Sequence, residues 1–200
     1  GKTTTLVHRI KHLIDTGVEP HKILALTFTN KAANELVERL KASSITGASD
    51  VWAGTFHAFG LEFLRKFHQL FSLPSEVRVA DQLMQVRLLV RQLPKVTLKY
   101  YRRLQDPYDW VPEVLGYIKR LKEELVSPQE YLRRLTLLGP CNADVEAQRH
   151  DIAALYDVYQ AAMKTEKLVD YTDLIAYPSQ QAKTNRASIG LFIDHYSHVL

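Results

Sequence analysis

The chain has 200 residues, 46% of them hydrophobic and 24% charged, a balance that excludes an intrinsically disordered or collagen-like protein. Its longest apolar stretch, residues 23–26 with their neighbours, is far shorter than the roughly 18 residues that a membrane helix needs. The net charge of +4 is too small an excess to indicate a partner by itself.

The first 70 residues alternate between helical and strand patterns. Apolar residues recur at helical spacing over 3–16, and Gly17 supplies a stop signal for that helix. Residues 23–28 form a short continuous apolar run, which is typical of a strand covered on both faces of a parallel sheet. Thr29 or Asn30 can cap the next helix, and a second strand over 51–54 precedes a helix over 56–67. This alternation predicts an α/β sheet.

Helical periodicity dominates after Phe71 for about a hundred residues. Asp81 and Ser127 can serve as N-caps, and a long helix is predicted over residues 144–167. We therefore expect a nearly all-helical segment over residues 71–165. Near the end, residues 192–198 are predicted to be helical and 199–200 to begin a buried strand.

Basic residues are concentrated between Arg65 and Arg103. This range contains nine basic and two acidic residues, which gives it a net charge of +7. The nine are Arg65, Lys66, Arg78, Arg87, Arg91, Lys95, Lys99, Arg102 and Arg103. Phe67, Tyr100 and Tyr101 are interleaved with them, which suits a polyanion because phosphates need counter-charge and unstacked bases need flat partners. A solvated helix face accounts for the charge equally well, and both interpretations stay open.

The chain begins with Gly1-Lys2-Thr3 at the start of an amphipathic helix, like the tail of a phosphate-binding loop. In such a loop glycine lets backbone amides approach phosphate oxygens, lysine pairs with the β and γ phosphates, and the hydroxyl binds Mg²⁺. The alternative is a surface lysine beside an ordinary helix start. Because no methionine or leader precedes Gly1, we expect a piece of a longer protein.

Three later segments give this tail a context: LALTFTNKAA at 24–33, GTFHAF at 54–59 and LVDYTDLI at 168–175. In this order the four segments resemble the early motifs of the superfamily 1 DNA helicases of the UvrD, Rep and PcrA type. The resemblance covers essentially the whole chain. It implies an α/β fold in which an incomplete RecA-like, parallel-sheet P-loop NTPase motor domain (1–70 and 166–200) carries a large all-helical inserted accessory subdomain (71–165).

The resemblance also implies two sets of binding residues. ATP and Mg²⁺ would be bound by Gly1, Lys2, Thr3 and Thr4, with Thr3 as the Mg²⁺ ligand. Single-stranded DNA would be contacted by Thr27, Phe28, Thr29, Asn30, Lys31, Thr55, Phe56 and His57. Phe28 and Phe56 could stack on bases while hydroxyls, His57 and helix N-termini contact phosphates. The alternative is that both phenylalanines are core residues at strand ends and that His57 caps a helix.

Two departures from the family pattern bear on catalysis. Thr4 stands where many members carry an arginine, and the chain ends before an Asp-Glu-x-x-Asp motif and every later motif. We therefore expect no catalytic residues within the chain, no appreciable ATPase activity of the isolated chain, and the remaining helicase domains outside it.

The function implied is the ATP-binding and DNA-binding part of an ATP-dependent 3′–5′ DNA helicase or translocase in DNA repair or replication. Its cofactors would be ATP and Mg²⁺, and its partners single-stranded DNA and duplex junctions, with no membrane. A non-catalytic single-strand-binding module and another P-loop phosphotransferase remain alternatives.

Other chemistry has little support. The single cysteine, Cys141, can form neither an internal disulfide nor a zinc site alone, so we expect a cytoplasmic protein, associated with the nucleoid if it is bacterial. Asp170 and Asp173 are explained by the start of a helix, with Asp170 at the N-cap and Asp173 in the first turn.

Overall fold

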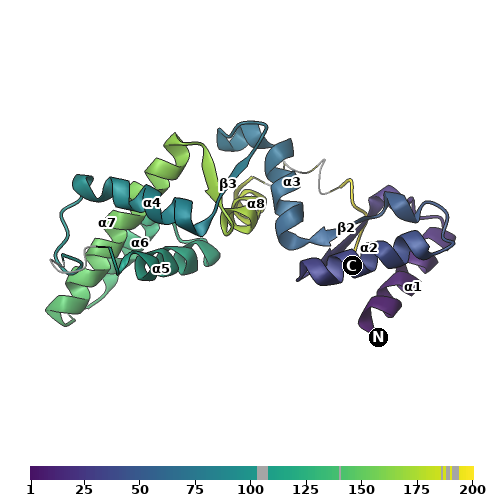
Figure 1. Ribbon diagram of the computed structural model, residues 1–200, viewed down its shortest axis with the longest axis horizontal. Coiled ribbons are helices and arrows are strands. Elements are labelled where there is room, and N and C mark those ends of the chain that lie inside the picture. The colour runs from purple at the N-terminus through teal and green to yellow at the C-terminus, as the bar shows by residue number, and fades with distance from the viewer. Residues whose placement is uncertain (103–107, 140, 186, 188–189, 191–193) are drawn as a thin grey trace. The chain divides into compact units, whose positions relative to one another are not determined.

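The computed structural model describes residues 1–102, 108–139, 141–185, 187, 190 and 194–200, and at Lys2 the backbone alone. The chain forms two compact units. Unit 1 comprises Gly1–Phe63 and Ser179–Leu200, so that both chain ends belong to it (Figure 1), and unit 2 comprises Leu64–Pro178. None of the described helices combines the length and the apolar character of a membrane span.

Unit 1 is built on a small parallel sheet with the strand order β2-β1-β5. Its elements are α1 (Lys2–Asp15), η1 (Pro20–Lys22), β1 (Ile23–Thr27), α2 (Asn30–Ala42), η2 (Ala48–Asp50), β2 (Trp52–Thr55), the start of α3 (Phe56–Lys66) and β5 (His198–Val199). In the register of β1 and β2, Thr27 lies opposite Thr55. The carboxyl ends of the two strands therefore lie side by side.

The local signals in unit 1 act as the sequence indicates. Thr16 follows the last residue of α1, and Gly17 adopts a φ of +94°, a conformation that costs glycine little. The Oγ1 of Thr29 accepts a hydrogen bond from the Ala32 amide at 3.2 Å and so caps α2. The core comprises Ile10, Leu13, Ile23, Ala25, Leu36, Leu40, Ala48 and Val51.

Unit 2 is largely helical. Its elements are η3 (His68–Phe71), β3 (Arg78–Ala80), α4 (Gln82–Gln92), η4 (Leu93–Lys95), α5 (Val111–Glu123), α6 (Pro128–Leu137), α7 (Ala143–Thr165), β4 (Leu168–Asp170) and the start of α8 (Asp173–Thr184). The long helix α7 packs against α4, α5 and α6 (Figure 1). Asp81 and Ser127 cap α4 and α6, accepting from the Met84 amide at 2.7 Å and the Glu130 amide at 3.1 Å, which confirms both expected caps.

Two expectations need correction. The segment 71–165 is nearly helical as the periodicity predicts but not all-helical as the resemblance implies, because the three-residue β3 lies within it and pairs in parallel with β4. Three residues are too few for periodicity to reveal a strand whose partner is distant in the sequence. The helix expected over 192–198 is wrong where the structure describes it: His198–Val199 is β5, and 192–193 lie outside the described residues. Val199 pairs with β1 but is 62% exposed, so this strand is not buried.

Candidate functional site

The carboxyl edge of the unit 1 sheet presents two aromatic rings to solvent. Phe28 and Phe56 each follow the last residue of a strand, and their ring centroids lie 5.2 Å apart with the planes tilted by 42°. Phe28 is 89% exposed and Phe56 is 39% exposed. The interpretation of these residues as core phenylalanines is therefore wrong. Large apolar rings that stay exposed at the ends of strands gain little free energy from burial in the folded chain. Their exposure favours a role in binding a ligand.

Threonine hydroxyls hold the backbone of this edge in place. Thr27 Oγ1 donates to the carbonyl oxygens of Gly54 at 3.3 Å and Thr29 at 3.2 Å, linking the two strand ends. Thr55 Oγ1 accepts from the Ala58 amide at 3.1 Å. This bond assigns the cap of α3 to Thr55, which corrects the alternative that His57 supplies it.

The remaining side chains expected at DNA lie on the same edge. Asn30 and Lys31 are exposed in the first turn of α2, and His57 is half-buried in the first turn of α3. The first turns of both helices present backbone amides with positive partial charge, which attract anions such as phosphates. The edge thus combines exposed rings, a lysine and two helix N-termini.

Gly54 has a geometric role at this edge that its motif position does not show. A Cβ on Gly54 would lie 2.6 Å from a ring carbon of Trp52, so only glycine lets that indole lie against the strand. The Trp52 Nε1 donates to Glu62 Oε2 at 2.6 Å, and the indole also meets Phe59 edge-on at 5.4 Å. Sequence reasoning missed Trp52 and Glu62 as supports of the edge. A tryptophan two residues before a strand glycine was the available signal.

A pocket of about 240 Å³ connects the start of α1 with the edge of the sheet. Its lining residues are Thr3, Leu6, Thr27, Phe28, Thr29, Ala32 and Leu36. Thr3, from the phosphate-loop tail, therefore shares a pocket with three residues of the first expected DNA segment. Thr4 Oγ1 instead accepts from Arg39 Nη1 of α2 at 2.8 Å. Gly1 is exposed at the N-cap of α1, and the Lys2 side chain lies outside the described part of the structure.

Unit 2 holds a buried ionic cluster at the junction of β4 and α8. Lys122 Nζ of α5 lies 2.5 Å from Asp170 Oδ2 and 2.7 Å from Asp173 Oδ1, and all three side chains are at most 7% exposed. Asp170 Oδ1 accepts from the Asp173 amide at 3.0 Å, and Asp173 Oδ2 accepts from the Asp170 amide at 2.9 Å. This reciprocal bonding joins the end of β4 to the start of α8. Asp173 lies in the first turn as expected, whereas Asp170 is the last residue of β4 and not the residue next to the helix, so its assignment as the N-cap is wrong.

The same cluster contains a group that sequence reasoning missed. Lys122 was not predicted as a partner, although it lies four residues after Ile118 on the buried stripe of α5. Burial raises the pKa of Asp173 to about 6, and Lys122 limits that rise. Tyr159 donates its hydroxyl to Asp170 Oδ2 at 3.1 Å. Burial, followed by the nearby aspartates, raises the pKa of this phenol as well.

The basic region of the sequence does not form one free surface. Arg91 Nη2 pairs with Glu166 Oε1 at 2.7 Å, while Arg78 Nη2 donates to the Glu166 carbonyl at 3.0 Å. Arg103 lies outside the described residues. Tyr101 is 1% exposed, so it is not available to stack on bases.

The loop before Arg103 is anchored by a buried carboxylate that the sequence did not indicate. Asp151 of α7 accepts from the amides of Lys99, Tyr100 and Tyr101 at 2.8–3.0 Å. Lys99 and Tyr100 remain exposed on this loop. Asp151 therefore fixes the backbone from which they project.

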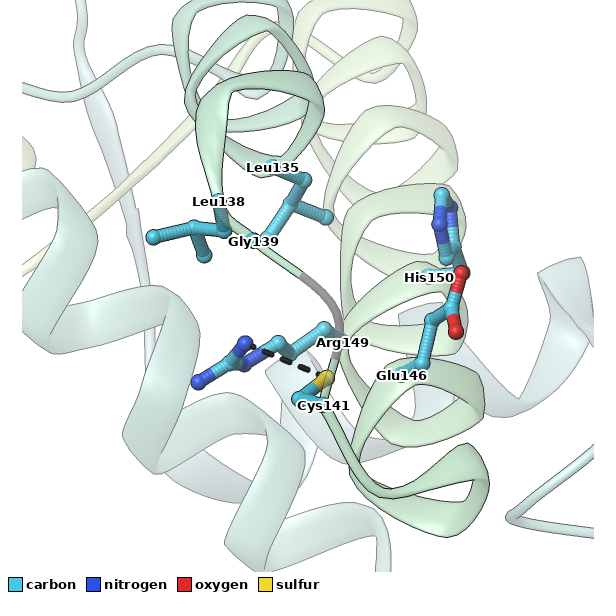
Figure 2. Close-up of a pocket in the computed structure, with 7 residues that line it drawn as sticks. All are labelled: Leu135, Leu138, Gly139, Cys141, Glu146, Arg149 and His150. Carbon is cyan, nitrogen blue, oxygen red and sulfur yellow. Dashed lines mark hydrogen bonds between the residues drawn. The ribbon is translucent and has the colours of Figure 1, made fainter.

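A further pocket of unit 2 lies between the end of α6 and the start of α7. Figure 2 shows Cys141 beside Arg149, whose Nη1 lies 3.6 Å from the Cys141 Sγ. Leu135 and Leu138 line the pocket from the side of α6. The thiol of Cys141, the single cysteine of the sequence, is exposed and free. None of the residues expected at ATP or DNA lines this pocket.

Comparisons with known proteins agree with the arrangement of these motifs. The family model for the UvrD/REP helicase N-terminal domain matches residues 1–200. The chain is 35% identical over 178 residues to an ATP-dependent DNA helicase PcrA of Leuconostoc citreum and 32% identical over 177 residues to DNA helicase II of Escherichia coli K12. It is 32% identical over 183 residues to an ATP-dependent DNA helicase PcrA of Bacillus subtilis.

Each of these matches covers 88% of this chain but 22% of the relative, so the chain spans about a fifth of the length of the relatives it matches. The family model, in contrast, extends over the whole chain and includes all four motif segments. The chain therefore belongs to the UvrD/REP helicase N-terminal domain family.

Proposed function

We propose that this chain is the ATP-binding and single-stranded-DNA-binding part of an ATP-dependent 3′–5′ DNA helicase or translocase. The observation that carries the proposal is the exposed Phe28–Phe56 pair at the carboxyl edge of β1 and β2. Relatives that bear the name DNA helicase add support. The polarity, the role in repair or replication and the use of duplex junctions rest on the motif resemblance alone.

DNA would be held mainly through its bases and phosphates, without base-edge readout. Phe28 offers an almost fully exposed ring for a base to stack on, and such stacking tolerates any sequence because every base has a π-face. Lys31, Asn30 and the N-termini of α2 and α3 can contact phosphates beside that base. The threonines at 27, 29 and 55 would act indirectly, because their hydroxyls already bind backbone groups.

The start of α1 fits the phosphate end of ATP. Gly1 occupies the N-cap of α1 without a side chain, and the first amides of the helix carry positive partial charge that attracts an anion. Bound there with Mg²⁺, ATP would supply a phosphoanhydride bond for hydrolysis. Lys2 would hold the β and γ phosphates and Thr3 would provide the Mg²⁺ ligand. Thr4 would support α1 through its bond with Arg39.

The pocket beside Thr3 is lined by residues of both proposed binding sets. Because Thr3 and Phe28 line the same pocket, ATP and DNA bound at these residues would lie close to each other. Residues 1–70 and 166–200 would form the truncated motor domain, and 71–165 the accessory subdomain. A non-catalytic single-strand-binding module is the competing function, and it would need no nucleotide.

The DNA part of the proposal is tested by replacing the exposed ring. Phe28→Ala should weaken binding of a 20-nucleotide oligo(dT) by about 1–3 kcal/mol, measured by fluorescence anisotropy, because one base loses its stacking partner. Tyr171→Ala removes an aromatic side chain of unit 2 that is 56% exposed and is not among the proposed DNA-binding residues, and it should leave the affinity unchanged. Equal affinities of Phe28→Ala and the parent chain would refute the assignment.

The nucleotide part is tested by separating binding from turnover. The isolated chain should show no appreciable ATPase activity, since it lacks the Asp-Glu-x-x-Asp motif that would position the attacking water. DNA-stimulated turnover that Lys2→Ala abolishes would contradict that expectation. Unchanged thermal unfolding in saturating ATP and Mg²⁺ would instead favour the non-catalytic module.

A further inference from the structure

Helix α4 carries an apolar face that the core of unit 2 does not cover. Leu88 and Leu89 are fully buried, whereas Leu83, Met84 and Val79 of neighbouring β3 are 58%, 42% and 38% exposed. The partly buried Val86 and Val90 continue the face of Leu83, at intervals of three and four residues along the helix, and they also pack against the core of unit 2. The apolar side chains of α4 thus extend from the core to Leu83 and Met84, which are open to solvent.

This face is the floor of a groove of about 660 Å³. The groove is lined by Arg78, Asp81, Leu83, Met84, Val86, Arg87, Val90, Arg91, Glu166 and Leu168. All of these residues belong to unit 2, so the groove is a feature of that unit by itself.

The charges on the rim of the groove do not balance. Arg91 is paired with Glu166, and the Asp81 carboxylate is occupied by capping α4. Arg78 donates only to a neutral carbonyl oxygen, and Arg87 forms no hydrogen bond or ion pair with any residue that the structure describes. Arg78 and Arg87 therefore form no ion pair with any described residue, and the lining of the groove carries three arginines against two carboxylates, a net charge of +1.

We propose that the α4 groove, formed by the ten residues above, is a docking site for a helical segment of a partner protein that carries large apolar side chains flanked by carboxylates. The apolar floor would receive Leu- or Met-type anchors at helical spacing, which is the usual way a groove binds an amphipathic helix. Arg78 and Arg87 would select acidic flanks, because unpaired guanidinium groups gain charge-assisted hydrogen bonds from carboxylates.

The composition of the groove favours such a segment over nucleic acid. Single-stranded nucleic acid binds on aromatic platforms, and none of the ten lining residues is aromatic. A phosphate backbone gains nothing from the exposed Leu83 and Met84 side chains. An acidic, apolar helix uses both features of the groove at once.

The test uses the 200-residue chain and a labelled 18-residue amphipathic peptide with leucine at positions i, i+3, i+4 and i+7 and glutamate at its flanks. Fluorescence anisotropy should show saturable binding that weakens as salt is raised. A peptide with lysine in place of glutamate, and a scrambled peptide of the same composition, should not bind. Binding of all three peptides with equal affinity would overturn the proposal.

Variants of the chain assign the binding to the groove. Arg87→Glu should weaken binding of the acidic peptide about tenfold, which corresponds to about 1.4 kcal/mol, and should strengthen binding of the lysine peptide. Leu83→Ser should weaken binding of the acidic peptide to a similar extent. Arg120→Glu, at an exposed arginine of α5 outside the groove, is the matched control and should bind like the parent chain. An Arg87→Glu variant that binds the acidic peptide unchanged refutes the proposed docking site.

Three other occupants have distinct outcomes, each of which would overturn the proposal. If oligo(dT) competes with the peptide and its binding depends on Arg87 but not on Leu83, the groove binds nucleic acid. If the chain alone dimerises in sedimentation experiments and Arg87→Glu abolishes the dimer, the occupant is a second copy. If a longer form of the protein fails to bind the peptide while the 200-residue chain binds it, the groove is covered by the protein's own remaining domains.

Discussion

The carboxyl ends of β1 and β4 both lead into a helix, but the side chains found there differ in polarity and in exposure. Each is the end of a parallel strand that leads within a few residues into a helix. After β1, Phe28 is 89% exposed although its side chain is apolar. At the end of β4, Asp170 is 5% exposed although its side chain is charged. Residue type alone therefore predicts the wrong environment at both junctions.

This contrast distinguishes a residue that is available to bind a ligand from a residue that belongs to the buried structure of the fold. An exposed phenylalanine contributes little to folding, so its presence at the end of β1 is best explained by something that binds there. Burying Asp170 costs desolvation energy, and it is tolerated because Lys122, the Asp173 amide and the Tyr159 hydroxyl compensate its carboxylate. The first junction is expected to matter for DNA, and the second for the integrity of unit 2.

The largest effect should come from removing the cation of the buried cluster. Lys122→Met would leave Asp170 and Asp173 buried without a counter-charge, which should lower the free energy of unfolding by about 3–5 kcal/mol at pH 7. Urea denaturation monitored by circular dichroism measures this loss. Lys119→Met is the matched control, because Lys119 lies on the same helix with its side chain 64% exposed. Equal stabilities of the two variants would show that the buried pairing is dispensable.

The same variant should also change the pH dependence of stability. The pKa of Asp173 is raised to about 6, so its contribution to stability is fully present below its unfolded pKa of about 4 and is lost as the pH rises through 6. Without Lys122, which lowers this pKa, the loss should extend above pH 6. The difference in unfolding free energy between Lys122→Met and Lys119→Met should therefore be smaller at pH 5 than at pH 7.

Much of the secondary structure follows from local signals in the sequence. The helices that begin at Gln82 and Pro128 start where Asp81 and Ser127 were expected to cap them, and the helix that begins at Asn30 is capped by Thr29, one of the two candidates. Such caps act over three residues, so the sequence contains all of the information. The short strand β3 was missed, and β5 was expected at 199–200 instead of His198–Val199, because both depend on pairing with β4 and β1, which local periodicity does not report.

The proximity of the two expected DNA segments was predictable from the sequence, but the environment of their side chains was not. The motif order placed Thr27–Lys31 and Thr55–His57 together, and the parallel register of β1 and β2 brings these segments to one edge. The exposure of Phe28 could not be derived from an apolar residue at the end of an apolar run. Lys122 and Asp151 were missed because their partners come from distant parts of the chain.

Asp151 is a second buried carboxylate, and its described partners are backbone amides and not a cation. Asp151→Asn should lower the free energy of unfolding by about 1–3 kcal/mol, because the amide nitrogen cannot accept from the backbone amides of Lys99, Tyr100 and Tyr101. Asp157→Asn, at an exposed position of the same helix, should change stability by less than about 0.5 kcal/mol. Thermal unfolding of both variants tests the difference, and a larger loss for Asp157→Asn would contradict the role given to Asp151.

The smallest effect on stability is expected at the exposed ring. Phe28→Ala should lower the free energy of unfolding by less than about 1 kcal/mol, because the ring is 89% exposed and loses mainly its contact with Phe56. Phe63→Ala, at a position 2% exposed, should cost about 3–5 kcal/mol through lost burial and a cavity.

Measuring unfolding and oligo(dT) affinity on the same Phe28→Ala sample separates the two roles of a phenylalanine. Near-parent stability with weakened DNA binding would show that the ring acts on a ligand and not in the core. A loss as large as that of Phe63→Ala would instead place Phe28 among the core residues, and the contrast between the ends of β1 and β4 would no longer hold. Because a base stacked on Phe28 would be absent from the unfolding experiment, the two measurements report independent quantities.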